Sequence, residues 1–428
     1  MGSKRLAVAL IAAQVAALLS VGSPVSAAGS YPPTEWVIGP EARVVMLTFN
    51  GSPRARSFLK ILETLESKNA KATFFLPGSW VQHHQEKSRL ARLAGHTLGN
   101  RGYGDARFTS LSDSALRSSI ARAERALKSV GESPKPFLRA PSDARDARVL
   151  RVAGSMGYRS VHWTYRPGGD TTKTVKRRVV RQARGGSIIS LDLWRKSHRM
   201  AIEGIIDGLR RRGFALKTID NLTNVQPIRW DVTLGSGSSG PDVKLLQKLL
   251  DRGTYPVGSK DGYFSSSTLQ ATYAFQKTRN LPRDGVMTPG EVIELAKSGP
   301  PKAPRRTPEN YTDIDISRQV MFEVRRGKVR HTTPISSGNE AYYTVDGQTY
   351  KAHTPRGDFS IVRKIAGKRV SRLGTLWWPS YFVGGYAVHG SDSVPTYPAS
   401  HGCVRIPRYV EKKFFYRNPV GTPLYVHD

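Results

Sequence analysis

Two short segments rich in glycine, serine and proline divide this chain, and they constrain its architecture more than any other feature. Residues 235–240 contain only glycine and serine, and residues 298–304 contain three prolines. Segments of this composition join units that pack separately, the first as a flexible linker and the second as a stiffer one. A chain of 428 residues has room for roughly three domains. We therefore expect three domains joined by two linkers.

The first 28 residues have the three parts of a secretory signal peptide. Lys4 and Arg5 precede an apolar run over 6–19 that is broken only by Gln14, and small residues follow at 26–28. The run is short for a membrane span, although an N-terminal anchor helix remains the alternative. The pattern predicts export to the cell wall or the extracellular space, with no stable membrane anchor after cleavage.

The excess of basic residues limits the classes of molecule that this chain is expected to bind. Lysine and arginine number 66 against 33 aspartates and glutamates, which gives a formal net charge of +33. A field of this sign attracts polyanions such as nucleic acids, anionic membranes or acidic wall polymers. Because an exported protein seldom meets nucleic acid, we expect anionic wall polymers as partners and no nucleic acid.

The apolar pattern changes from one predicted domain to the next. In the first, short apolar runs alternate with helical patterns, which predicts an α/β domain built from βα units around a parallel sheet or barrel. The middle part predicts a small α-helical module, because its apolar residues have helical spacing. The last part predicts a β-rich domain. The expected strands are 44–49, 72–76, 160–163, 187–191, 214–217, 312–316, 320–324, 359–362, 386–388 and 423–426, and the expected helices include 57–67, 112–130 and 199–212.

The only cysteine lies in a segment that indicates a nucleophile. Cys403 is part of the sequence Ser-His-Gly-Cys-Val-Arg at 400–405, and His389-Gly390 ends an apolar strand upstream. A thiol attacks as a thiolate, so it needs an imidazole to take its proton. The glycines allow backbone N–H groups to approach a developing oxyanion. A lone cysteine packed as a small apolar residue is the alternative.

These residues resemble the motif of YkuD-type L,D-transpeptidases, and the resemblance covers 310–428. The sequence Thr-Pro-Arg-Gly-Asp-Phe at 354–359 and the ending at 421–426 also match that family. The resemblance implies that Cys403 is acylated, that His389 is the base, and that the Gly390 carbonyl orients the imidazole. It implies two acyl transfers, from a donor stem peptide to Cys403 and then to an amine of a neighbouring stem, which gives a 3→3 cross-link without metal or nucleotide. Hydrolysis and protein attachment remain open as other outcomes.

The resemblance also assigns supporting residues. It implies that His401, Gly402 and the Cys403 amide line the oxyanion site, next to Ser400. Arg405 would support the pocket or hold a substrate carboxylate. Tyr381 is a candidate for a further hydrogen-bond donor, with simple packing as the alternative.

The middle module, residues 238–298, resembles the peptidoglycan-binding type 1 domain. The resemblance rests on Gly-Pro-Asp-Val at 240–243, Asp-Gly-Tyr-Phe at 261–264 and Ala-Phe-Gln at 274–276. It implies peptidoglycan glycan strands and stem peptides as partners. Its leucines and phenylalanines are expected to form the core of the module.

The first domain, residues 42–225, resembles a NodB-type polysaccharide deacetylase, which has a distorted βα barrel and a metal site. The family motif T-F-D-D-G-P has Asn50 and Gly51 in place of its two aspartates, and Arg101 and Asp105 replace the two metal-binding histidines. Asp192 stands where the resemblance places the acid histidine. A hydrolytic zinc site needs about three protein ligands, so we expect this domain to be inactive and to hold no metal.

Three hypotheses follow for the whole chain. The first is an exported cysteine L,D-transpeptidase with a deacetylase-like domain that binds the wall. The second is an active metal-dependent deacetylase, and the third is a wall-binding protein without catalysis. The candidate sugar-binding aromatic residues of the first domain, each with ordinary burial as its alternative, are Trp80, Trp163, Tyr165 and Trp194.

Overall fold

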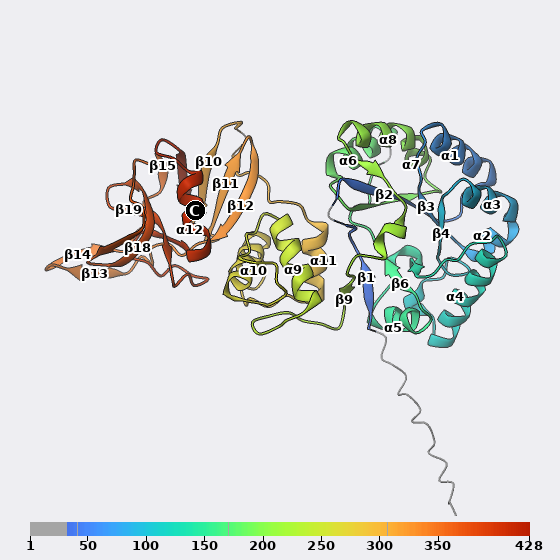
Figure 1. Cartoon of the computed structure of the whole chain (residues 1–428), viewed down its shortest axis with the longest axis horizontal. Coiled ribbons are helices and arrows are strands. Elements are labelled where there is room, and N and C mark those ends of the chain that lie inside the picture. Colours follow the sequence, from blue (N-terminus) through green and yellow to red (C-terminus); the bar gives the residue numbers. More distant parts are fainter. Residues whose placement is uncertain (1–31, 41, 170, 306) are drawn as a thin grey trace, which may run out of the picture.

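The computed structural model describes residues 32–40, 42–169, 171–305 and 307–428. The predicted signal peptide, residues 1–28, lies outside the described residues. Figure 1 shows an α/β domain, a small helical module and a β-rich domain following one another along the long axis of the molecule. The multidomain prediction is confirmed. No helix in the described part of the chain is long and apolar enough to cross a bilayer.

The first domain is built on one curved sheet in the order β7-β2-β3-β4-β5-β6-β1-β9, with β8 beside β2. All neighbours are parallel except β1 and β9. After β6 the chain returns to β7 through a bridge between Tyr165 and Ile189, which links the two sides of the sheet. The strands are β1 (Thr34–Trp36), β2 (Val44–Asn50), β3 (Thr73–Leu76), β4 (Thr97–Asn100), β5 (Phe137–Leu138), β6 (Arg159–Val161), β7 (Ser187–Asp192), β8 (Ala215–Leu216) and β9 (Ile228–Arg229).

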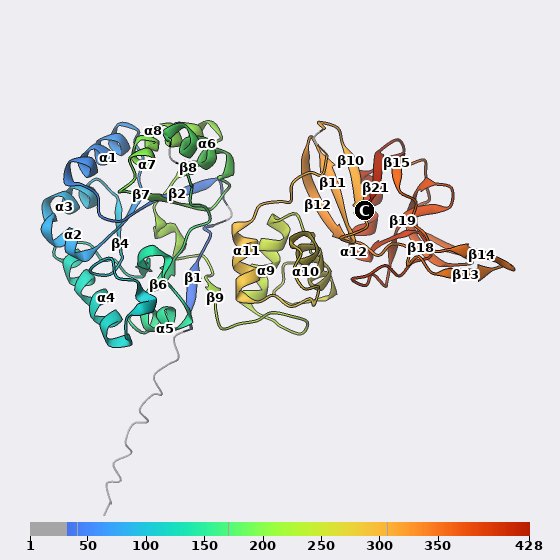
Figure 2. The same ribbon diagram turned by 180° about the vertical axis from the view of Figure 1, so that it is seen from behind.

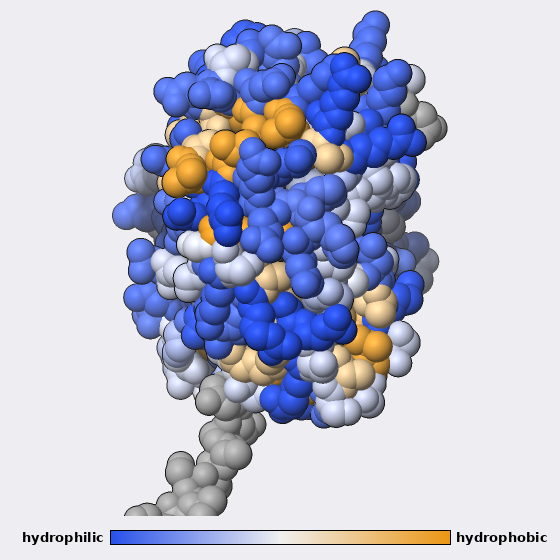
Figure 3. Space-filling model, turned by 90° about the vertical axis from the view of Figure 1, so that its right-hand side faces the viewer, coloured by the Kyte–Doolittle hydropathy of each residue, from blue (hydrophilic) through white to orange (hydrophobic). Residues whose placement is uncertain are grey.

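Helices surround this sheet on the outside (Figures 1 and 2). Helix α1 is amphipathic and buries Phe58, Ile61 and Leu65 against the strands. The outward face of the domain is mostly hydrophilic, with small separate apolar patches (Figure 3). The helices are α1 (Ala55–Ser67), α2 (Gly78–His83), α3 (Gln85–Leu93), α4 (Asp113–Lys128), α5 (Ala147–Ser155), α6 (Thr172–Gln182), α7 (Lys196–Met200) and α8 (Ile202–Arg211), and short 3₁₀ turns lie at Phe108–Ser110, Pro141–Asp143 and Ile219–Leu222.

The helical module consists of α9 (Pro241–Arg252), α10 (Ser266–Arg279) and α11 (Pro289–Lys297). Val243, Leu246 and Leu250 are fully buried in its core, as their spacing predicted. The flexible linker predicted at 235–240 is wrong, because this segment is hydrogen-bonded to the module. Ser238 accepts the amide of Phe264, and Gly240 donates to Gly262. Glycine provides the positive φ that this tight path requires at Gly240, where φ is 106°.

The last domain has two sheets and a projecting hairpin. One sheet has the order β12-β11-β10-β21-β15, and the other has β16-β18-β19-β20 with β17 beside β18. Strands β13 and β14 pair only with each other. The elements are β10 (Tyr311–Asp315), β11 (Val320–Arg325), β12 (Lys328–Pro334), β13 (Tyr342–Val345), β14 (Gln348–Lys351), β15 (Gly357–Ser360), β16 (Arg363–Lys364), β17 (Lys368–Ser371), β18 (Gly374–Val383), β19 (Tyr386–Ser391), β20 (Val404–Pro407), α12 (Arg408–Arg417) and β21 (Pro423–His427).

The helical module packs directly on the last domain. Lys277 of α10 is 1% exposed and donates through Nζ to the Ile335 carbonyl, at 3.1 Å. Gln270, on the same helix, donates to the carbonyl of Val394, also at 3.1 Å. The two domains therefore share polar contacts, and the one made by Lys277 is buried.

The buried lysine makes this packing sensitive to pH. Burial lowers the pKa of Lys277 from 10.5 to about 7, and the charge of Arg283 adds to the effect. Between these two pKa values the folded state binds fewer protons than the unfolded state, so stability rises with pH in that window and is lower below pH 7. One proton contributes a slope of at most about 1.4 kcal/mol per pH unit.

Lys277→Met should weaken this dependence. We expect the free energy of unfolding of the module, measured by urea titration between pH 6.5 and 9.5, to rise less steeply in the variant than in the parent protein. Lys248→Met, at an exposed position of α9, serves as the matched control and should keep the parent's slope. If the free energy of unfolding of Lys277→Met depended on pH as steeply as that of the parent, the lowered pKa of Lys277 would be contradicted.

Candidate functional site

The candidate site is built by the pairing of two strands. Strand β19 lies parallel to β20, with Val388 opposite Val404 and His389 opposite Arg405. Because side chains alternate along a strand, the two valines enter the core of the domain, and His389 and Arg405 lie on the other face. Cys403 directly precedes β20 and has the same parity as Arg405. The sheet thus brings Cys403, His389 and Arg405 to one face.

A hydrogen bond fixes which ring nitrogen of His389 carries the proton. Its side chain is buried, and Nδ1 lies 2.9 Å from the Gly390 carbonyl oxygen. A carbonyl can only accept, so Nδ1 carries the proton and Nε2 has the lone pair of a base. The pKa of His389 is lowered to about 4, mainly by burial; the Gly390 hydrogen bond acts in the opposite direction, and the positive charge of Arg405 adds to the lowering. The imidazole is therefore neutral at neutral pH.

Cys403 is half-buried beside a small apolar cluster of Leu376, Tyr381 and Ala387. Its Sγ donates to the Gly385 carbonyl at 3.8 Å. Burial raises the pKa of the Cys403 thiol above its usual value, although the Ala387 amide and Arg405 act in the opposite direction. The resting state is accordingly a thiol on the same face of the sheet as a neutral imidazole.

The loop before Cys403 is fixed by side-chain hydrogen bonds. Ser400 Oγ donates to the Cys403 carbonyl at 2.5 Å and accepts the Gly402 amide at 3.0 Å. Gly402 has a φ of 123°, and a Cβ at this position would lie 2.6 Å from Cε1 of Tyr386. Only glycine fits such a position. Within the described residues, the amides of His401 and Cys403 have no hydrogen-bond acceptor, whereas that of Gly402 is occupied.

Arg405 and Tyr381 border the same face. Arg405 is half-buried and, within the described part of the chain, makes no ion pair with a carboxylate. Its guanidinium is thus available to a substrate group. Tyr381 is 4% exposed, and the Arg363 guanidinium lies 4.0 Å from the centre of its ring. Tyr381 packs in the cluster beside Cys403, and its role as a hydrogen-bond donor stays a prediction.

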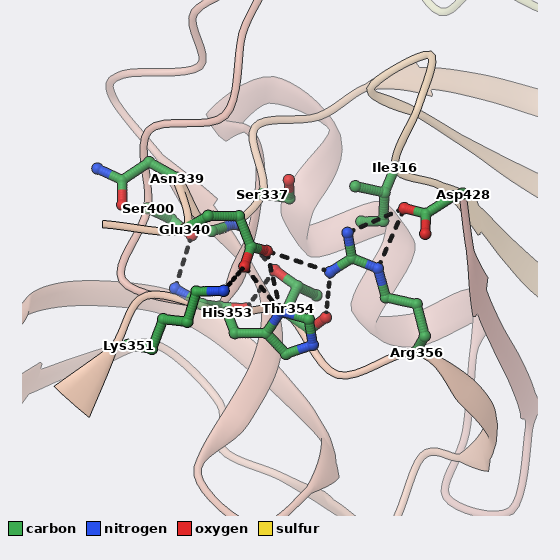
Figure 4. A network of polar contacts seen from close by, with 12 residues as sticks. Ile316, Ser337, Asn339, Glu340, Lys351, His353, Thr354, Arg356, Ser400 and Asp428 are labelled. Atoms are coloured by element: carbon green, nitrogen blue, oxygen red, sulfur yellow. Dashed lines mark hydrogen bonds and ion pairs between the residues drawn. The ribbon is translucent and has the colours of Figure 1, made fainter. Parts of the chain in front are cut away.

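The sequence prediction missed a second group of residues at this site. Tyr343, on β13, presents the edge of its ring to His401, with 4.7 Å between ring centroids. Glu340 and His353 lie at the base of the same hairpin, in the polar network of Figure 4. The missed signal is the dipeptide Asp346-Gly347 between two runs rich in tyrosine and threonine, which is typical of a two-residue hairpin turn.

Asn50 and Asp192, which stand at positions singled out by the deacetylase resemblance, are bound by neighbouring polar residues of the first domain. Asn50 donates to Ser190 Oγ at 2.6 Å and accepts from Arg139 at 2.8 Å. Both carboxylate oxygens of Asp192 accept from Arg166 at 2.9 Å.

Arg101 forms an ion pair with Asp105, and Gly51 has no side chain to offer. No group of three His, Cys, Asp or Glu side chains suited to a metal occurs in the part of the chain described. A hydrolytic zinc ion needs about three such ligands, so the residues present do not fit one.

The aromatic residues of this domain fall into two groups. Trp80 is 7% exposed and donates to the Pro53 carbonyl, so it packs in the core and offers no sugar platform. Tyr165 packs partly against the same core. Trp163 is half-buried beside the guanidinium of Arg166, and Trp194 is 58% exposed. Trp163 and Trp194 are the aromatic rings that remain accessible.

Three family models match separate parts of the chain. Residues 38–161 match polysaccharide deacetylase, residues 239–291 match a putative peptidoglycan binding domain, and residues 309–426 match the L,D-transpeptidase catalytic domain. The three resemblances drawn from sequence motifs are confirmed.

Two individual proteins each match somewhat less than half of the chain. The chitooligosaccharide deacetylase of Azorhizobium caulinodans is 26% identical over 207 residues, which cover 43% of this chain and 99% of that protein. A peptidoglycan-N-acetylglucosamine deacetylase of Bacillus cereus is 24% identical over 198 residues, covering 44% of this chain and 91% of that protein.

Two solved structures complete the comparison. The L,D-transpeptidase of Xylanimonas cellulosilytica is 40% identical, over 45% of this chain and 97% of that one, with a TM-score of 0.44. A CE4 family pseudoenzyme from Bacillus anthracis is 23% identical, over 45% of this chain and 69% of that one, with a TM-score of 0.42. The matches to the polysaccharide deacetylase and L,D-transpeptidase family models support an enzyme that modifies the cell wall.

The protonation states of His389 and Cys403 predict that the rate of acylation changes little with pH in the neutral range. A base whose pKa is lowered to about 4 stays competent down to that pH, and a thiol whose pKa is raised stays protonated through the neutral range. The rate of acylation of Cys403 by a carbapenem, followed by mass spectrometry, should be nearly constant from pH 5.5 to 8 and fall towards pH 4. A half-maximal rate near pH 6.5 would contradict this environment of the imidazole.

The same assay compares the two histidines as a matched pair. His389→Ala should slow acylation by about 10²–10⁴-fold, the usual contribution of a general base. His401→Ala should slow it much less, because only His389 is proposed to take the thiol proton and the His401 side chain is exposed beside the ring of Tyr343. Equal rates in His389→Ala and the parent would exclude His389 as the base.

The first domain should release no acetate. Because Asn50, Gly51, Arg101 and Asp105 do not form a metal site, we expect the purified chain to bind no stoichiometric zinc and to leave acetylated glycans intact. Single restorations such as Asn50→Asp should stay inactive, since neither the metal site nor the base would be complete. About one zinc per chain by metal analysis, with acetate release that is lost on chelation, would show instead that the chain has two activities.

Proposed function

We propose that this chain, which combines polysaccharide deacetylase, peptidoglycan-binding and L,D-transpeptidase catalytic domains, is an exported enzyme that forms 3→3 cross-links in peptidoglycan through a thioester on Cys403. The observation that carries the proposal is the hydrogen bond between His389 Nδ1 and the Gly390 carbonyl. It leaves Nε2 as the basic nitrogen, on the face of the sheet that also presents Cys403.

The first acyl transfer starts from the neutral pair. Sγ of Cys403 attacks the carbonyl of the third residue of a donor stem, and its proton passes to Nε2 of His389. The low pKa of His389 makes the imidazolium a strong acid, which then returns the proton to the departing amine of the terminal D-alanine. The peptide bond breaks, a thioester forms, and no cofactor is required.

Backbone amides are the proposed donors to the oxyanion. Those of His401 and Cys403 have no acceptor among the described residues and belong to the loop that carries the sulfur, so they are available to the negative oxygen that develops on the attacked carbonyl. The amide of Gly402 is held by Ser400 in this state. Gly402 therefore contributes its backbone geometry, and Ser400 holds the turn that aims the two free amides.

The second transfer regenerates the thiol. An amine of a neighbouring stem loses a proton to His389 and attacks the thioester, and Cys403 leaves and is reprotonated. Arg405 is the proposed partner for a carboxylate of the stem, because its half-buried guanidinium has no carboxylate partner among the described residues. A bound substrate carboxylate would supply the missing negative charge.

The other two domains are proposed to hold the enzyme on its polymer. The middle module belongs by its family match to a peptidoglycan-binding fold, and the first domain keeps the fold of a glycan-modifying enzyme without its metal ligands. The net charge of +33 adds a long-range attraction to anionic wall polymers that weakens as salt rises. Secretion by the first 28 residues would bring all three domains to the wall.

Cys403→Ser should abolish cross-linking and keep wall binding. A serine hydroxyl beside the same imidazole is a far weaker nucleophile than a thiolate. Dimer formation from a purified tetrapeptide stem, followed by chromatography and mass spectrometry, should fall below detection, while sedimentation with insoluble peptidoglycan should match the parent. A serine variant with near-normal turnover would overturn the assignment of the nucleophile.

A further inference from the structure

The hairpin β13–β14 stands apart from both sheets of the last domain. Its strands pair only with each other, and Figures 1 and 2 both show it projecting beyond the rest of the domain. The turn at Asp346 and Gly347 has φ values of 54° and 73°, which match the twist of a two-residue hairpin. A hairpin without a third strand has little stability of its own. Its position must be fixed by contacts with the rest of the domain or by what it binds.

The base of the hairpin is fastened to the loop that carries Cys403. The amide of Asn339 donates to the Ser400 carbonyl at 3.1 Å, and Thr354 Oγ1 donates to the Gly402 carbonyl at 2.8 Å. Thr354 Oγ1 also accepts the amide of Gly338 at 2.9 Å. The hairpin therefore has a fixed direction relative to the nucleophile.

An ionic network closes the same base (Figure 4). Glu340 pairs with Lys351 at 3.1 Å, with His353 at 2.9 Å and with Arg356 at 3.4 Å. Partial burial alone would raise the pKa of Glu340, but the hydrogen bonds from His353 and Lys351 lower it, so the carboxylate stays ionised. The tip is also anchored, because Asp346 forms an ion pair with Arg372 at the turn between β17 and β18.

The two faces of the hairpin differ in chemistry. Residues directly opposite each other in a ladder share a face, so the pairings divide the eight side chains into two sets. One set, which we call the tyrosine face, consists of Tyr343, Val345, Gln348 and Tyr350. The other set consists of Tyr342, Thr344, Thr349 and Lys351.

The tyrosine face is continuous with the candidate site. The rings of Tyr343 and Tyr350 stack with 5.8 Å between centroids and 27° between planes. Tyr343 in turn contacts His401, and its pKa is raised by burial and by its neighbours Tyr386, Tyr350 and Cys403. Tyr350 remains 43% exposed. An apolar, aromatic surface thus extends from Cys403 outward along the hairpin.

The chemistry of this face selects a neutral ligand. It contains two aromatic rings, a valine and an amide, and no charged side chain, in a chain whose net charge is +33. A carboxylate of a stem peptide finds no cation on it. A sugar ring offers apolar C–H groups to an aromatic ring and hydroxyls to an amide or a phenol, which is the combination that this face can receive.

We propose that the tyrosine face is a glycan subsite, which binds the sugar of the wall strand whose stem peptide enters the Cys403 site. The proposal rests on the transpeptidase function proposed above and adds a substrate element to it: the enzyme recognises a stem while it is attached to its glycan. Tyr343 lies nearest the nucleophile, and Tyr350 extends the surface towards the sugar.

The test compares two donors, a free tetrapeptide stem and the same stem linked to its disaccharide. We expect the parent to have a higher kcat/KM for the linked donor. Tyr350→Ala should lower the ratio of the two kcat/KM values by about tenfold, the order of one lost aromatic contact, through KM for the linked donor. Tyr342→Ala is the matched control, because the same residue type stands next to Tyr343 in sequence but on the opposite face, 74% exposed. It should keep the ratio of the parent.

Two outcomes would overturn the subsite. One is a parent that uses free and linked stems equally well. The other is a Tyr350→Ala variant that keeps the parent's ratio, or that loses kcat on both donors alike, which would mean that the hairpin only supports the catalytic loop.

If neither donor acylated Cys403 of the parent protein, the proposed function would be refuted, and the subsite would be tested by a binding measurement. For that case, the affinity for a glycan strand without stems is measured by titration on the Cys403→Ser chain. Because the other two domains contribute equally to all variants, additional loss of affinity in Tyr350→Ala, absent from Tyr342→Ala, supports the subsite. Equal affinities in the two variants contradict it.

Discussion

The parallel pairing of β19 with β20 is the constraint on which the candidate site depends. With Val388 opposite Val404, two valines enter the core, and this alone turns His389, Arg405 and the preceding Cys403 to the opposite face. A shift of β19 by one residue would turn Val388 out of the core and bury His389 in it. The register is thus fixed by hydrophobic burial, and the chemistry follows from it.

The helical module supports the same site from behind. Ser336 pairs with Arg405 and Gly338 pairs with Ser400, so the segment 335–338 forms the back of the nucleophile loop. Lys277 of the module donates to Ile335, the first residue of that segment, and Gln270 donates to Val394 on the path between His389 and Cys403. A domain proposed to hold peptidoglycan is therefore in direct contact with the backbone that positions the thiol.

The core of the first domain is independent of the residues that the deacetylase resemblance singles out. Its apolar strands and amphipathic helices form a cluster that contains none of Asn50, Gly51, Arg101 and Asp105. At the ends of β2 and β7, arginines bind the polar residues: Arg139 donates to Asn50, and Arg166 forms an ion pair with Asp192. These contacts satisfy the hydrogen-bonding groups of both side chains within the domain.

The sequence by itself determined the three domains, the main strands and the residues around Cys403, because apolar periodicity and short motifs are local properties. The predicted strands for β2, β7 and β19 begin at the observed residues, and those for β2 and β7 end one residue early. The strands β4 and β14 were missed. Their polar residues form strands only because a neighbouring strand supplies their hydrogen bonds. It also mistook 235–240 for a flexible linker, since nothing local reveals that Ser238 and Gly240 bond to the module. Only the tertiary structure decided that Tyr343 reaches His401 and that Lys277 lies beneath the nucleophile loop. Such contacts join residues far apart in the chain, and their geometry is set by packing, which no short stretch of sequence encodes.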